Sequence, residues 1–271
     1  MPEDQVRDSR TGKAPGLSLG VGICALNERL ALPRLLTRLT SVRDPLDRAD
    51  QVVVADGGSQ DGSVELAVRG GAEVLATGRG RGVQLRAAAA RLLEGGHDVL
   101  LFLHADSIPR TGSIRSLREA FCAAPGKEGA RAAAMRQVID AEGRTYRWIE
   151  RAANARSRRG MVYGDSGLAV RSDLYLDAGG FQEIPLFEDV DFSKRIRGRS
   201  AIQLVESATL VISARRWEEE GLLRSSVRNW ILRGLYECGV SPERLVRMYR
   251  PFSGSKAAAS ASPQEETPPV S

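Results

Sequence analysis

The hydrophobic residues of the first half of the chain follow two different periods. Four continuous apolar runs predict strands buried on both faces of a sheet: LSLGVGICAL at 17–26, QVVVAD at 51–56, AEVLAT at 72–77 and DVLLFLHAD at 98–106. The segments between and after them have helical spacing and predict helices over 28–42, 62–69, 83–93 and 111–124. Strands separated by helices predict βαβ crossovers and a largely parallel sheet with helices on both faces.

The second half has a less regular pattern. It predicts strands near 130–139, 167–170, 202–205 and 209–213, and helices near 146–158, 189–197 and 222–238. No linker-like change in composition and no internal repeat interrupts residues 17–252, so we expect a single α/β domain there. Residues 1–16 and 253–271 are rich in small, polar and proline residues, and we expect both ends to be disordered.

Composition narrows the classes of partner. A chain of 271 residues with 42% hydrophobic content can bury a sizeable core. Its net charge is +5 without a basic tract, which favours anionic small molecules or a membrane surface and argues against nucleic acid. The three cysteines, Cys24, Cys122 and Cys238, have no CxxC spacing, so we expect a reducing, cytoplasmic setting. No apolar run approaches the roughly 20 residues that span a bilayer.

Polar clusters follow each of the first four predicted strands. They are ALNE, ADGGSQDG, TGRGRG and HADS. Because ligands of open parallel sheets bind at the carboxyl ends of the strands, these clusters predict a ligand-binding site, and each supplies groups that a sugar nucleotide could use. The candidate groups are Asn27 and Glu28 for hydrogen bonds, Asp56 for a base imide, Arg79 and Arg81 for a diphosphate, and Asp106 for a hard metal ion.

Each cluster also has a structural interpretation. Asp56 and the glycines after it could form a turn with a helix cap, the arginine loop could be solvated, and Asp106 could cap the next helix. The sequence GVGICA matches a dinucleotide-binding pattern, but it falls inside the first strand and lacks the turn that binds phosphate.

A second acidic cluster opens the helix predicted at 189–197. Glu188, Asp189 and Asp191 could simply oppose the helix dipole. Alternatively, one carboxylate could act as a general base on a hydroxyl group. The segments YGDSGLAVR at 163–171 and SARRW at 213–217 would suit a cleft for the molecule that carries this hydroxyl, although either could be structural.

In their order along the chain these motifs resemble a family 2 glycosyltransferase. More narrowly, they resemble the bacterial radical-SAM/selenodomain-associated transferases, some of which are linked with arsenosugar biosynthesis. The resemblance covers nearly all of residues 17–250 and implies a GT-A fold with a mixed, acceptor-binding C-terminal half. It also implies an inverting mechanism, a nucleotide-diphosphate sugar donor, a hydroxyl acceptor of unknown identity, and Mg²⁺ or Mn²⁺.

The resemblance carries roles to matching positions. It implies that Asn27 and Glu28 line the nucleoside pocket, that Asp56 contacts the base, and that Arg216 and Trp217 flank the diphosphate and acceptor. It implies that Asp106 is the last acid of a DxD metal motif and that Asp189, beside Glu188, is the catalytic base of the ED motif. His104 replaces the first acid of DxD, so we place it among the donor-binding residues without assigning it as a metal ligand.

Two other functions remain open from the sequence. One is a sugar-phosphate nucleotidyltransferase, although ALNE replaces its usual glycine-rich loop after the first strand. The other is a non-catalytic module that binds sugar nucleotides, which the histidine at position 104 would permit. The helix predicted at 222–238 is amphipathic; it could pack on the core or make weak peripheral contact with the inner face of the cell membrane.

Overall fold

The computed structural model describes residues 17–122 and 128–248, without the side chains at 216, 219–220, 222–227 and 230. The ends that we expect to be disordered, 1–16 and 253–271, lie outside the described residues, as does the predicted domain boundary at 252.

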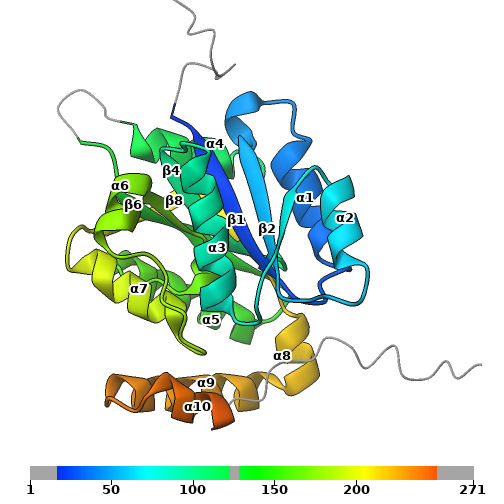
Figure 1. Cartoon of the computed structure of the whole chain (residues 1–271). Helices are drawn as coiled ribbons and strands as arrows, with labels where there is room; N and C mark the ends of the chain where they lie inside the picture. Colours follow the sequence, from blue (N-terminus) through cyan, green and yellow to red (C-terminus); the bar gives the residue numbers. More distant parts are fainter. Residues whose placement is uncertain (1–16, 123–127, 249–271) are drawn as a thin grey trace, which may run out of the picture.

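The described residues contain eight strands joined by helices (Figure 1). The strands are β1 (Leu19–Ala25), β2 (Gln51–Asp56), β3 (Glu73–Ala76), β4 (Val99–His104), β5 (Ser107–Pro109), β6 (Ala132–Asp140), β7 (Leu168–Arg171) and β8 (Ile202–Ser213). The α-helices are α1 (Leu32–Thr40), α2 (Ser63–Arg69), α3 (Arg81–Glu94), α4 (Ser113–Phe121), α5 (Arg144–Arg158), α6 (Ser172–Asp177), α7 (Glu188–Arg197), α8 (Arg215–Glu220), α9 (Leu222–Glu237) and α10 (Pro242–Met248). Two 3₁₀ turns are η1 (Pro45–Asp47) and η2 (Gly164–Ser166).

All eight strands form one sheet in the order β3-β2-β1-β4-β7-β6-β8-β5. The pairs β2-β3, β1-β2, β1-β4 and β6-β8 are parallel, whereas β7 is antiparallel to both β4 and β6, and β5 is antiparallel to β8. The sheet therefore confirms the predicted α/β class, with a parallel front half and a mixed second half.

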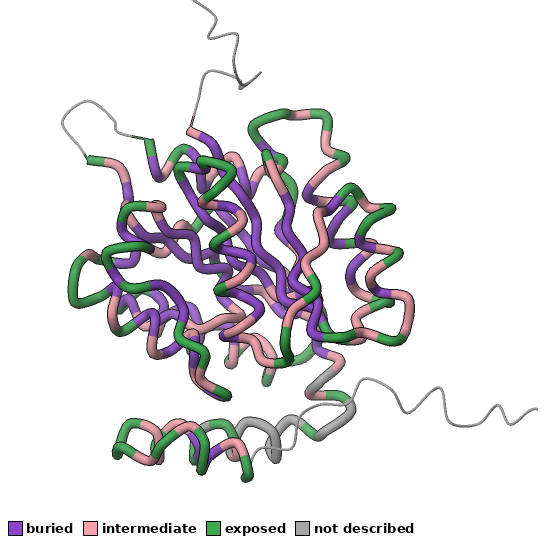
Figure 2. Tube along the Cα trace, in the orientation of Figure 1, coloured by how far each residue is buried: buried purple, intermediate pink, exposed green. Residues whose placement is uncertain are grey.

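The core lies on both faces of this sheet, because neighbouring strand residues point in opposite directions. In β4, Leu101 and Leu103 join a cluster with α1 and α4, whereas Leu100 and Phe102 join a cluster with α3 and α7. Figure 2 shows the resulting buried strands between partly exposed helices. A sheet covered on both faces explains why its strands have continuous apolar sequences.

The GVGICA segment lies within β1, as its apolar context predicted. A Cβ atom on Gly20 would lie 2.6 Å from the Leu92 side chain of α3. The glycine thus allows close packing between a helix and a strand.

Several boundaries differ from the predictions. The first helix begins at Leu32, with a proline in its first turn, and not near 28. The two strands predicted at 202–205 and 209–213 are one strand, β8, because residues 206–208 bulge out of its pairing with β6 between Met135 and Arg136. The short elements β5, α6, α8 and α10 were not predicted.

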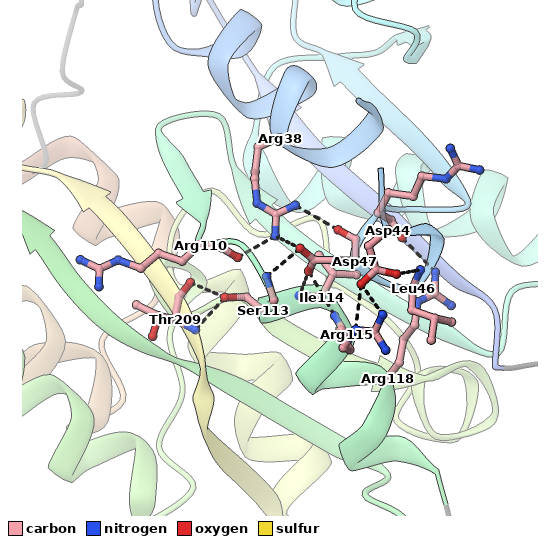
Figure 3. A network of polar contacts seen from close by, with 12 residues as sticks. Arg38, Asp44, Leu46, Asp47, Arg110, Ser113, Ile114, Arg115, Arg118 and Thr209 are labelled. Carbon is pink, nitrogen blue, oxygen red and sulfur yellow. Dashed lines mark hydrogen bonds and ion pairs between the residues drawn. The ribbon is translucent and has the colours of Figure 1, made fainter. Parts of the chain in front are cut away.

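Helix α4 is capped by Asp47, a buried residue from a distant turn (Figure 3). One carboxylate oxygen of Asp47 accepts a hydrogen bond from Gly112 N–H at 2.6 Å, and the other accepts from Ile114 N–H at 3.1 Å. Arg38 donates to the same carboxylate at 2.9 Å. Asp47 therefore satisfies backbone groups at the start of α4, a role that the sequence also permitted for Asp106.

The last two helices lie beside the domain at the edge where β1 and β2 end (Figure 1). Leu232 of α9 and Leu245 of α10 are buried with Leu186, which precedes α7. On α9, Leu232 is buried whereas the neighbouring Ile231 is 54% exposed, so the amphipathic helix packs one side against the segment before α7. Within the described residues, no helix is long and apolar enough to cross a membrane.

Candidate active site

The carboxyl ends of β1, β2 and β4 meet at one edge of the sheet. Cys24 is in register with His104, and Ala25 is in register with Asp56. This register brings the polar segments after the three strands together, as the parallel sheet predicted.

The loop after β1 is held against the loop after β2 and the start of α2 by hydrogen bonds between backbone N–H groups and side chains. Asn27, whose φ is 56°, donates its N–H to Ser59 Oγ at 2.8 Å and accepts from Gln60 N–H through Oδ1 at 2.9 Å. Glu28 N–H donates to Ser63 Oγ at 2.8 Å. Asn27 therefore shapes this rim through its own hydrogen bonds.

Asp56 is buried at the end of β2 and organises the following turn. Its Oδ2 accepts from Gly58 N–H and Ser59 N–H, each at 2.9 Å, and the Ser59 hydroxyl donates to Oδ1. These contacts match the turn interpretation. They also fix the carboxylate in one orientation at the edge where a nucleotide base is expected.

Glu28 lies close enough to Asp106 for the charge of Asp106 to act on it. Burial first, and the negative charge of Asp106 second, raise the pKa of Glu28 to about 7. Arg215 offsets part of this, with its Nη2 3.5 Å from Glu28 Oε2. Asp106 has one hydrogen bond in the described part of the chain, from Ser107 Oγ at 3.5 Å. Asp106 therefore does not cap α4, and its carboxylate is open to a ligand.

The two predicted diphosphate arginines differ in environment. Arg79 is exposed, whereas Arg81, the first residue of α3, has its Nε 2.8 Å from Glu188 Oε1. Glu188 raises the pKa of Arg81, and burial raises the pKa of Glu188 although Arg81 opposes that shift. Arg81 is thus positioned by a buried carboxylate at the start of α7.

His104, Gly164 and Asp189 meet in one small space. Asp189 Oδ2 accepts from Gly164 N–H at 2.6 Å, and Oδ1 accepts from Val190 N–H at 2.7 Å. A Cβ atom on Gly164 would lie 2.6 Å from His104 Nε2 and 2.9 Å from Asp189 Oδ2. Both side chains therefore pack directly against Gly164, where any larger residue would collide with them.

His104 has the environment of a neutral imidazole. Burial, and then the charge of Arg81, lower the pKa of His104, while the nearby carboxylates oppose this shift. Its Nε2 is buried and has no hydrogen-bond partner among the described residues. A buried polar atom without a partner is costly, so Nε2 is a candidate contact for a bound molecule.

The sequence did not single out an aromatic and cationic group beside Asp189. The guanidinium carbon of Arg156 lies 3.6 Å from the centre of the Tyr163 ring, and that of Arg233 lies 4.0 Å from it. Arg156 Nη2 is 3.9 Å from Asp165 Oδ1. Tyr163 and Asp165 lie in the YGDSGLAVR segment, but the two arginines come from α5 and α9, and no local motif marks them.

The RW pair is only partly described. The Arg216 side chain lies outside the described residues, and the Trp217 ring centre is 6.2 Å from that of Tyr146. The preceding residue, Arg215, is the one that pairs with Glu28.

Among the described residues, no three His, Cys, Asp or Glu side chains form a group that could hold a metal by themselves. A divalent cation at Asp106 would therefore need ligands from a bound phosphate and from water, an arrangement that suits Mg²⁺.

Comparisons with known proteins agree with this architecture. A model of the family described as glycosyl transferase family 2 matches residues 20–172, more than half of the chain. No curated protein matches the chain.

Three solved structures have similar folds. The first is residues 1–349 of TarS from S. aureus, with TM-score 0.54, 14% identity and coverage of 84% of this chain and 68% of that one. A mannosyltransferase from Pyrobaculum calidifontis in complex with GDP-Man and Mn²⁺ has TM-score 0.53, 18% identity and coverage of 72% and 56%. GalNAc-T7 with UDP, GalNAc and Mn²⁺ has TM-score 0.54, 14% identity and coverage of 74% and 44%. The chain thus spans between less than half and about two thirds of these structures.

Because the sequence identities are low, the likeness to these structures shows the fold alone, and this fold is GT-A. The family match lies over β1 to β7 and includes the strand ends that carry Asp56, His104 and Asp106. This chain therefore belongs to glycosyl transferase family 2 and is a glycosyltransferase.

Proposed function

We propose that the protein is an inverting glycosyltransferase that moves a sugar from a nucleotide-diphosphate sugar to a hydroxyl acceptor. In this proposal Asp189 is the general base, and Asp106 holds Mg²⁺ or Mn²⁺. The observation that carries it is the position of Asp189, whose carboxylate is held by Gly164 N–H and packs, together with His104 at the end of β4, against Gly164. We place the chain in the radical-SAM/selenodomain-associated subfamily on its motifs alone.

The donor would bind along the edge formed by the loops after β1, β2 and β4. Asp56 and the Asn27 rim would contact the nucleoside, and the diphosphate would face Arg81 and Asp106. A divalent cation bound at Asp106 would supply positive charge for the diphosphate leaving group. The Mn²⁺ found with the sugar nucleotide in the mannosyltransferase structure supports this choice of ligand.

Asp189 is suited to act as the base because two backbone N–H groups fix its carboxylate without occupying all of its lone pairs. It would accept the proton of the acceptor hydroxyl as the hydroxyl oxygen bonds to the anomeric carbon. The bond from that carbon to the diphosphate breaks at the same time, and its electron pair stays on the diphosphate oxygen. A single displacement of this kind inverts the anomeric centre.

The first test replaces the base. Asp189→Asn keeps the shape of the side chain but cannot accept the proton, so we expect donor binding to persist and transfer to fall by at least about 100-fold. Sugar nucleotides are first screened with Mn²⁺ by thermal shift, because a bound ligand raises the stability of the folded state. Calorimetry then measures donor affinity, and release of nucleoside diphosphate measures turnover. Full turnover by the purified variant would exclude Asp189 as the base.

The matched experiment replaces the metal residue. Asp106→Ala should lose the Mn²⁺-dependent part of donor affinity, whereas Asp189→Asn should keep it. The two variants therefore separate binding from chemistry. Unchanged Mn²⁺-dependent titration of Asp106→Ala would remove Asp106 from the metal site.

A further inference from the structure

A cavity of about 430 Å³ lies between α5 and the neighbouring strands, and arginines form most of its wall. We call it the arginine cavity and define it by Arg110, Arg136, Arg147, Arg151 and Arg158, which line it together with Glu150. Its volume falls in the range of small-molecule sites, roughly 300–1,000 Å³. None of these residues belongs to the donor site or contacts Asp189 through a described interaction.

Two of the arginines line the same cavity because the backbone of each lies beside Thr209 of β8. Arg136 of β6 is in register with Thr209, and Arg110 N–H donates to Thr209 O at 2.8 Å. Strand β8 lies between β6 and β5, so the two residues approach it from opposite sides. Figure 3 shows the Arg110 side chain pointing away from the Asp47 network.

Helix α5 supplies the other wall. Its three arginines are four and seven residues apart, a spacing that puts them on one side of a helix. Asn154 fastens this helix to β6, because its Oδ1 accepts from Gln137 N–H at 2.8 Å and its Nδ2 donates to Gln137 O at 2.9 Å. The wall is thus held in place by buried hydrogen bonds.

The charges of the cavity are not balanced. Glu150 Oε1 forms an ion pair with Arg147 Nη1 at 2.8 Å and accepts a hydrogen bond from Ile139 N–H at 2.5 Å. Arg158 pairs with Glu206 at 2.7 Å. The three remaining arginines are Arg110 in the loop after β5, Arg136 in β6 and Arg151 in α5. None of them forms an ion pair within residues 17–122 and 128–248.

We propose that the arginine cavity is a binding site for a ligand with phosphoryl groups, separate from the donor site. A guanidinium group matches phosphate oxygens in a bidentate manner. Three of them on three elements can share the several oxygens of a phosphoryl group, whereas a carboxylate offers two oxygens in one plane. The phosphoryl group could belong to a free small molecule or to a lipid headgroup.

The test measures binding of inorganic pyrophosphate by calorimetry in EDTA, so that metal-dependent binding at the donor site does not contribute. The wild-type protein should bind pyrophosphate, and the variant Arg110→Gln, Arg136→Gln, Arg151→Gln should bind it at least ten-fold more weakly. Because the three side chains are exposed, the variant should keep its fold, which circular dichroism checks. If it does not fold, Arg136→Gln alone should still weaken binding.

The control carries the same change in net charge at a remote surface. Arg34→Gln, Arg43→Gln, Arg69→Gln changes three exposed arginines near α1 and α2 and should leave the affinity unchanged. An equal loss in this control would show an effect of overall charge and would overturn the proposal.

A second arm separates the two sources of the phosphoryl group. Wild-type protein is sedimented with vesicles of phosphatidylcholine, with and without phosphatidylglycerol. Binding to the anionic vesicles that the cavity variant loses identifies a lipid headgroup, and binding of pyrophosphate alone identifies a free ligand. If wild-type protein binds neither probe, or if the cavity variant binds both as wild type does, the proposal is wrong.

Discussion

Gly164 is the residue against which both His104 and Asp189 pack. Any larger residue would place a Cβ atom against both side chains, at 2.6 Å from His104 Nε2 and 2.9 Å from Asp189 Oδ2. Its N–H also holds the carboxylate of Asp189. A side chain at this position would therefore move the proposed base without removing it.

We expect Gly164→Ala to lower kcat by about 10- to 100-fold while the protein remains folded, since a displacement near 1 Å in an active site can cost about that much. Donor affinity, measured by calorimetry, should change much less than turnover. Gly198→Ala is the control, because a Cβ there would meet its nearest atom at 3.5 Å. Equal kcat values for the two variants would show that the spacing at Gly164 is unimportant.

The sequence predicted which site residues lie near one another only through their positions at the ends of parallel strands. The sequence placed Glu28, Asp56 and Asp106 after strands whose carboxyl ends would share one edge, and the register of β1, β2 and β4 brings these strand ends together. Local sequence could not show that Asn27 Oδ1 accepts from Gln60 N–H, because that donor reaches it only when the two loops fold against each other. The roles assigned to these residues in donor binding stay predictions.

At the scale of single elements, α4 depends on a cap from elsewhere in the chain. Gly112 precedes its first turn and has no side chain to cap it, and Asp47 accepts the free N–H groups instead. Arg38 of α1 completes the network. This one carboxylate therefore connects α1, η1 and α4.

We expect Asp47→Ala to lower the free energy of unfolding by about 2–4 kcal/mol, because it removes a cap and leaves Arg38 without its buried partner. Urea denaturation followed by circular dichroism measures the change. Asp44→Ala is the matched control, since Asp44 lies three residues earlier and pairs with Arg115 in a more exposed position. A loss no larger than that of the control would contradict the role given to Asp47.

Element boundaries were less predictable than the elements themselves. The four strands of the front half were predicted from their apolar runs. Strands β1, β2 and β4 are buried on both faces, whereas β3, at the edge of the sheet, is only partly buried. The break between the two strands predicted at 202–205 and 209–213 was wrong because a bulge interrupts the pairing without ending β8. Only the neighbouring strand β6 shows that the two parts are continuous.

At the scale of the whole molecule, the C-terminal helices α9 and α10 pack against the segment that precedes the proposed base, Asp189. Leu232 and Leu245 bury Leu186, two residues before Glu188, and the Phe187 ring lies 5.0 Å from that of Tyr236. Helices α9 and α10 therefore support the segment that leads into α7.

We expect Leu245→Ala to loosen α9 and α10, because emptying a fully buried leucine site costs about 2–5 kcal/mol of packing. Amide hydrogen exchange should become faster in both helices and in the 186–189 segment, and turnover should fall. Ile231→Ala is the control on α9, since Ile231 is largely exposed. Unchanged exchange at 186–189 in Leu245→Ala would disprove the coupling.

The sequence alone determined the α/β class, the parallel front half and the strand ends at which chemistry gathers, because periodicity and strand-end position are local properties of a chain. Tertiary structure decided which groups meet across long separations. It set Gly164 between His104 and Asp189, paired Arg81 with Glu188, and brought arginines from three elements to one cavity. These contacts depend on strand order and helix packing, which no local pattern encodes.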